Sequence, residues 1–169
     1  LSRFFNTGVY SLGEVHQTLA PAMDIQVASN FERYLYYRTG SDPAGLRALM
    51  AKFADSGRLA VDVTPGTAVD PVFEAGAAGT DDVLEAIRSS YERYEYLVDP
   101  HTACGLAVAQ ARVPAAVGAS GDRAEDESPL VCIATAHPAK FPKAIRQATG
   151  KDLARHPRID ELMQLPTRC

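Results

Sequence analysis

The sequence has few of the residues that would mark a specialised class of protein. It contains no tryptophan and only three cysteines, Cys104, Cys132 and Cys169, with no Cys-x-x-Cys pair. An odd cysteine count without that spacing argues against a disulfide scaffold and a zinc site, and it favours a reducing compartment, so we expect a cytoplasmic protein without a metal. No apolar run approaches the roughly 18 residues that cross a bilayer. The net charge of -4 provides no basic patch for nucleic acid or membranes.

What the sequence does have is enough apolar residues for a core and several clear helix boundaries. Hydrophobic residues make up 46% of the 169 residues, which fits a single globular domain. Two Asp-Pro pairs, at Asp42 and Asp99, predict helix starts, because an N-cap carboxylate is followed by proline at the first helical position. Residues 1–10 resemble the end of a helix, with Gly8 at its C′ position and no cap before it. We therefore expect the chain to be a piece of a longer polypeptide.

The fold class is expected to be α/β and rich in helices, with at least one buried strand of the parallel type. Pro129–Ala134 is a continuous apolar run between turn signals, which predicts such a strand. A strand of this kind needs neighbours on both edges, so we expect upstream residues to complete the sheet. Ala103–Ala109 is apolar all round, which predicts a buried helix. Residues 113–128 read as an acidic surface connection.

Candidate site residues follow the predicted buried strand. Ligands of open α/β sheets bind beyond the carboxyl ends of the strands, where Thr135, His137 and Lys140 lie. Thr135 either offers its hydroxyl to a ligand or caps the turn between strand and helix. His137 could be a general base, or a turn histidine bonded to a backbone carbonyl. Lys140 is more typical of a solvated surface charge than of a catalytic amine.

Five further polar residues, in three segments of the chain, are candidates for a site. Asp99, His101 and Thr102 stand close together, but neighbouring side chains of a first helical turn diverge, so capping by Asp99 explains them better than a nucleophilic triad. Asp24 and Asn30 could line a site, or could serve only in local capping and turns.

Four segments together resemble the C-terminal portion of the threonine synthases. They are RFFNTGVY (residues 3–10), PAMDIQVASNFER (21–33), DPHTACG (99–105) and ATAHPAKFP (134–142). The resemblance covers nearly the whole chain and implies a pyridoxal phosphate enzyme of fold type II. It would convert O-phospho-L-homoserine and water to L-threonine and phosphate. Residues 1–169 would form the C-terminal portion of the large cofactor-binding domain, with a helical insertion at roughly 40–98.

The same resemblance implies roles for individual residues. Thr135 would place its hydroxyl against the pyridine nitrogen of the cofactor, and Asp24, Asn30, His101 and His137 would lie near the site. The Schiff-base lysine has no match among these residues and is expected upstream, so no catalytic residue is assigned to this chain. We therefore expect this chain alone to be inactive and to depend on the upstream part of the same polypeptide.

Two alternatives remain open from the sequence. One is a threonine synthase-like phospho-lyase that acts on a related phosphorylated hydroxy amino acid. The other is a non-catalytic helical interaction domain.

Overall fold

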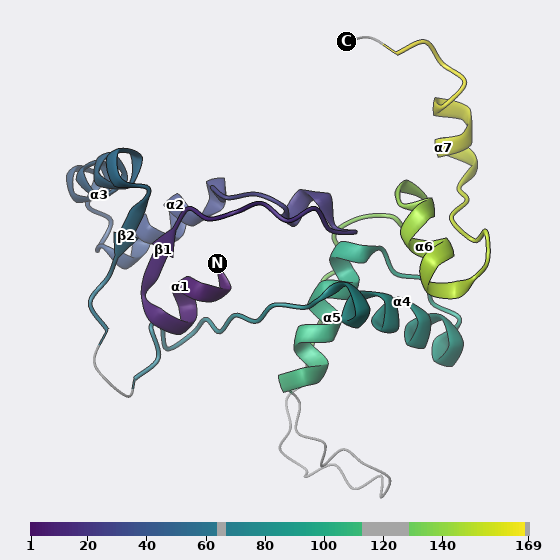
Figure 1. Ribbon diagram of the computed structural model, residues 1–169, viewed down its shortest axis with the longest axis horizontal. Coiled ribbons are helices and arrows are strands. Elements are labelled where there is room, and N and C mark those ends of the chain that lie inside the picture. Colours follow the sequence, from purple (N-terminus) through teal and green to yellow (C-terminus); the bar gives the residue numbers. More distant parts are fainter. Residues whose placement is uncertain (64–66, 113–128, 168–169) are drawn as a thin grey trace, which may run out of the picture. The chain divides into compact units, whose positions relative to one another are not determined.

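The computed structural model describes residues 1–63, 67–112 and 129–167, which fall into two compact units (Figure 1). The first unit comprises Leu1–Gln17 and Asp24–Gly76, and the second comprises Thr18–Met23 and Ala77–Cys169. The expected surface connection at 113–128 lies outside the described residues. The helices and strands are α1 Ser2–Thr7, β1 Val9–Ser11, η1 Pro21–Met23, α2 Ser29–Arg38, α3 Pro43–Ser56, β2 Arg58–Ala60, α4 Thr80–Tyr94, α5 Pro100–Arg112, η3 Pro138–Lys140, α6 Pro142–Thr149 and α7 Pro157–Leu162.

The first unit is held together by aromatic side chains around a short sheet. Helix α1 ends at Gly8 in the left-handed conformation, with φ 74°, and the chain turns directly into β1. Strands β1 and β2 are antiparallel and pair Tyr10 with Leu59. The core consists of Phe4, Tyr10, Phe31, Leu35, Phe53, Leu59 and Val69. Burying such large side chains excludes more apolar surface from water per residue than any other choice, which stabilises a unit that has only two short strands.

Helix α3 begins and ends where its sequence predicts. The side chain of Asp42 accepts hydrogen bonds from the backbone N–H groups of Ala44 and Gly45, and Pro43 takes the first helical position. Gly57 ends the helix at φ 65°. These contacts satisfy groups that a helix end leaves without partners, which explains why the boundaries are so sharp.

The second unit is a small helical assembly in which α4 packs against both α5 and α6. Ile87 of α4 and Ile145 of α6 are fully buried at its centre, together with Val83, Leu84, Ala86, Val98, Ala103, Ala148 and Ala154. Helix α5 departs from the expectation of burial all round. Its first turn, Pro100–Ala103, is buried, whereas within the expected range Gly105 is exposed and residues 104 and 106–109 are only half-buried.

The buried strand predicted at Pro129–Ala134, whose sheet upstream residues were expected to complete, does not form within this chain. Residues 129–134 form no strand in the structure, and Leu130, Val131 and Ile133 are 65%, 77% and 76% exposed. A strand is stable only when its N–H and C=O groups pair with a neighbour. The two strands among the described residues, β1 and β2, pair with each other and not with this segment.

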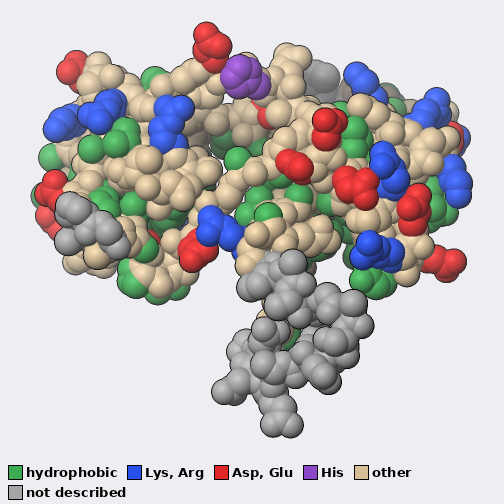
Figure 2. Space-filling model, turned by 60° about the horizontal axis from the view of Figure 1, so that its bottom comes forward, with side chains coloured by type: hydrophobic (Ala, Val, Ile, Leu, Met, Phe, Trp, Pro, Cys, Tyr) green, Lys and Arg blue, Asp and Glu red, His purple; other side chains and the backbone are tan. Residues whose placement is uncertain are grey.

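Acidic and basic side chains are interspersed on the surface at the right of Figure 2. Within the described ranges, every helix is too short or too polar to cross a bilayer.

Candidate functional site

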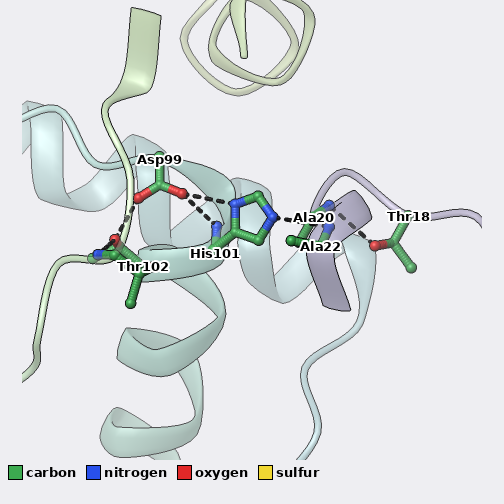
Figure 3. A network of polar contacts seen from close by, with 7 residues as sticks. Thr18, Ala20, Ala22, Asp99, His101 and Thr102 are labelled. Carbon is green, nitrogen blue, oxygen red and sulfur yellow. Dashed lines mark hydrogen bonds and ion pairs between the residues drawn. The ribbon is translucent and has the colours of Figure 1, made fainter. Parts of the chain in front are cut away.

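Asp99 lies at the centre of a buried polar cluster at the start of α5 (Figure 3). Its Oδ1 accepts hydrogen bonds from the backbone N–H of His101 and from the ring Nδ1 of the same residue, both at 2.9 Å. Its Oδ2 accepts a hydrogen bond from the hydroxyl of Thr102. The bond to the backbone confirms that Asp99 caps the helix, as its position before Pro100 predicts.

The cluster extends from Asp99 along two branches to distant segments. On one branch, the hydroxyl of Thr102 accepts a hydrogen bond from the backbone N–H of Thr135 at 3.1 Å. On the other, Nε2 of His101 accepts a hydrogen bond from the backbone N–H of Ala22 at 3.2 Å. We call these five residues the Asp99 network. It joins three of the four segments on which the family resemblance rests, across separations of 79 and 33 residues.

The hydrogen bonds keep Asp99 ionised although it is fully buried. Burial acts to raise the pKa of this carboxyl group. The hydrogen bonds from the Thr102 hydroxyl and from the backbone and ring of His101 outweigh burial, so the pKa lies below its ordinary value. Hydrogen bonds to a charged acceptor are stronger than neutral ones, which makes the cluster a rigid local element.

His101 has no free ring nitrogen. Its side chain is 7% exposed, and Phe141 packs against the ring with centroids 4.8 Å apart. Because Nε2 accepts a hydrogen bond from a backbone N–H, the neutral ring carries its hydrogen on Nδ1, which donates to Asp99. A general base needs a nitrogen that can reach substrate, so His101 serves as a buried link rather than as a base.

The three side chains of Asp99, His101 and Thr102 converge, although the sequence suggested that they would diverge. The reason is that an N-cap carboxylate reaches over the first helical turn, where both partners lie. A nucleophilic triad is nevertheless absent from them, because the hydroxyl of Thr102 donates to Asp99 and not to the imidazole.

Thr135 combines a fixed backbone with a free side chain. Its N–H is bonded to Thr102, its side chain is exposed, and its hydroxyl makes no hydrogen bond with the described part of the chain. The residue therefore does not cap the following turn, and its hydroxyl is available to a ligand. A hydroxyl can donate or accept, so it fits a ring nitrogen in either state.

His137, and not Thr135, caps the turn that follows this segment. Its Nδ1 accepts a hydrogen bond from the backbone N–H of Ala139 at 3.1 Å and so caps η3. The expected partner was a carbonyl, and the actual partner is an N–H, because the first turn of a helix leaves N–H groups unsatisfied. The exposed ring also contacts that of His156, with centroids 4.8 Å apart.

Asp24 and Asn30 belong to the first unit and are described within it. Asp24 is half-buried and has an interaction partner. Asn30 is exposed on the first turn of α2 and lines a pocket of about 460 Å³ that also contains Arg33 and Arg38. Asp70 accepts a hydrogen bond from the Tyr34 hydroxyl in this pocket.

A second pocket, of about 210 Å³, lies beside the Asp99 network. Thr102 of the network lines it together with Ala134, the residue before Thr135, so the pocket borders both α5 and the segment that leads to Thr135. The remaining lining residues are Ser89, Ser90, Arg93, Tyr94, Tyr96, Val98, Leu106, Gln110 and Cys132. Cys104 and Cys132 are free thiols, and the described residues contain no cluster of side chains that would hold a metal ion.

Known proteins resemble this chain along its whole length. A family model described as threonine synthase, C-terminal, matches residues 102–169. The threonine synthase of Pseudomonas aeruginosa is 32% identical over 170 residues, covering 100% of this chain and 34% of that protein. Threonine synthase-like 1 of Pongo abelii is 32% identical over 151 residues, covering 88% of this chain and 19% of that protein.

A solved structure shares the fold. The PLP-bound threonine synthase of Brucella melitensis matches with a TM-score of 0.80 and 37% identity, covering 96% of this chain and 33% of that one. The likeness confirms the expected fold class, a helix-rich C-terminal portion of an α/β fold. The chain spans about a third of the length of the threonine synthases it matches.

Proposed function

Because this chain is homologous to the C-terminal portion of the threonine synthase family, we propose that it is that portion of a threonine synthase. The whole enzyme would convert O-phospho-L-homoserine and water to L-threonine and phosphate, a carbon–oxygen lyase reaction that uses pyridoxal phosphate. This chain would be inactive alone and would act with the upstream part of the same polypeptide. Residues 1–169 would form the C-terminal portion of the large cofactor-binding domain, with a helical insertion at roughly 40–98. We expect the enzyme to be cytoplasmic.

The observation that carries the proposal is the state of Thr135. In a segment that the family resemblance includes, its backbone is held by the buried Asp99 network, while the residue is exposed and its hydroxyl has no partner in the described residues. Pyridoxal phosphate supplies an electron sink when bound, and the protein orients and tunes it. A threonine hydroxyl at the pyridine nitrogen would leave that nitrogen less protonated than a carboxylate would, which moderates the sink.

The lysines of this chain do not suit the covalent attachment of the cofactor. Lys52, Lys140, Lys143 and Lys151 are all exposed, whereas a lysine activated for Schiff-base chemistry is usually desolvated. We expect borohydride reduction of the complete enzyme, followed by peptide mass mapping, to find the cofactor on a lysine outside this chain. A cofactor-bearing peptide that contains one of these four lysines would overturn the assignment.

The reaction itself is tested with the complete enzyme and O-phospho-L-homoserine, by measuring threonine and phosphate release in parallel. Equal release of both products supports the proposal. Phosphate release without threonine would instead favour a phospho-lyase with another product.

Two substitutions at Thr135 test its role. Thr135→Ser keeps the hydroxyl and should retain the absorbance of the bound cofactor. Thr135→Asp should shift that absorbance and lower kcat, because a carboxylate favours the protonated pyridine nitrogen. An unaltered spectrum and rate in the aspartate variant would refute the contact between Thr135 and the cofactor.

A further inference from the structure

We propose that Thr102 is the positioning residue of the cofactor site, because its buried hydroxyl fixes the backbone of Thr135. The inference rests on the proposed function in one respect, namely that Thr135 contacts the cofactor. The positioning itself is a property of this chain and is measurable without the cofactor.

The segment that carries Thr135 has a single hydrogen bond to hold it. Among the described residues 129–136, the bond from the Thr135 N–H to Thr102 is the only hydrogen bond. The segment lacks a strand partner, and its apolar side chains at 130, 131 and 133 are exposed. The Thr102 hydroxyl is therefore the polar contact that determines where Thr135 lies relative to α5.

The segment that carries Thr135 also packs against α5, in addition to the hydrogen bond between Thr135 and Thr102. Gly105 lies so close to this segment that a Cβ added to it would stand 3.4 Å from Sγ of Cys132. Cys132 and Ala134 also line one pocket with Thr102. These contacts bring the segment near α5, but apolar contacts have no direction, and the hydrogen bond sets the orientation of the peptide group.

Asp99 makes Thr102 an acceptor for Thr135. A hydroxyl has one hydrogen and can donate it once. Because the Thr102 hydroxyl donates to the ionised Oδ2 of Asp99, its lone pairs are turned toward the N–H of Thr135. Thr102 is 5% exposed and Asp99 is fully buried, so the bond between these two side chains is shielded from water.

The test compares Thr102→Val with Thr102→Ser in the complete enzyme. Valine keeps the size of threonine and removes the hydroxyl, while serine keeps the hydroxyl. Thr149→Val is the control, because it removes a half-buried threonine hydroxyl elsewhere in the same unit, one that bonds within α6 and to Lys151.

The first measurement is hydrogen–deuterium exchange of the cofactor-free enzyme. We expect the amide of Thr135 to exchange about three- to tenfold faster in Thr102→Val, the range that the loss of one net hydrogen bond produces. Thr102→Ser and Thr149→Val should match the parent at this amide. Unchanged exchange at Thr135 in Thr102→Val would overturn the proposal.

The second measurement is the dissociation constant and the absorbance of pyridoxal phosphate. Thr102→Val should bind the cofactor about three- to tenfold more weakly, by the same reasoning, and Thr102→Ser should restore the parent value. If Thr102→Val fails to fold, the serine variant decides: loss of protection at Thr135 in a folded serine variant refutes the positioning role. If exchange at Thr135 rises but cofactor binding is unaffected in both Thr102→Val and Thr135→Asp, the positioning is upheld and the proposed cofactor contact fails.

Discussion

Gly8 gives the sharpest quantitative prediction about the first unit, because Gly40 provides a matched control. Both glycines adopt left-handed backbone conformations, with φ 74° and 73°. An alanine in this conformation costs about 1–2 kcal/mol, partly offset by about 0.4–1 kcal/mol from the smaller freedom of the unfolded chain. From the backbone alone, both alanine variants should lose roughly 1 kcal/mol of unfolding free energy.

The two positions differ in the space around them. A Cβ at Gly40 would meet nothing within 4 Å, whereas a Cβ at Gly8 would stand 2.6 Å from Cγ2 of Val63 and 2.9 Å from the carbonyl oxygen of Val61. The valine methyl can rotate away, but the carbonyl cannot move freely, because the N–H of Val61 is bonded to the carbonyl of Gly8 itself. Overpacking of this kind costs about 1–3 kcal/mol.

We therefore expect Gly8→Ala to lose about 2–4 kcal/mol and Gly40→Ala about 1 kcal/mol. The assay is urea unfolding of the complete protein followed by circular dichroism, with midpoints compared at an unchanged m-value. Equal midpoints for the two alanine variants would show that the close approach at Gly8 has no energetic weight, and would refute the reasoning.

Three other predictions use the same unfolding measurements. Asp42→Ala should destabilise the protein by about 1 kcal/mol through loss of the cap of α3, and Asp42→Asn should lose much less, since its amide oxygen can still accept. Tyr10→Phe should cost about 1–3 kcal/mol, because its hydroxyl joins the N–H of Ala28 to the carbonyl of Gln26, and an unchanged midpoint would mean that water replaces it. Folding lowers the pKa of the Asp99 carboxyl group, so its carboxylate stabilises the folded protein fully above the unfolded pKa of 3.8. This stabilisation is lost as the pH falls through the folded pKa. Asp99→Asn should therefore weaken the pH dependence of the unfolding free energy below about pH 4.

The parts of the fold that the sequence predicts are those with a local cause. Helix α3 is bounded by Asp42 and Gly57 through contacts within a few residues, and α6 likewise ends at Gly150. The strand expected at 129–134 is not formed within this chain, because strand formation depends on a partner, which no property of six apolar residues can supply. Strand β1 was missed for the converse reason, since its partner β2 lies about fifty residues away.

The candidate site divides in the same way. Capping by Asp99 is a local contact and was predicted. The bond between Thr102 and Thr135 spans 33 residues, and no periodicity or motif spacing indicates it. The one available signal for this contact was indirect. DPHTACG and ATAHPAKFP both belong to the family resemblance, which implies that both lie near the same site. The role of His137 depended on a backbone donor two residues ahead, which a turn sequence leaves ambiguous.

The Asp99 network has a further property, which follows from the groups at its two ends. Each branch begins at a backbone N–H, that of Ala22 or that of Thr135, and such a group can only donate. Every hydrogen along both branches must then point inward, until the two branches end on the two oxygens of one carboxylate. Only one arrangement of hydrogens satisfies all the partners, so the network cannot pass a proton from one end to the other. The network therefore holds its two distant segments in place and does not relay protons between them.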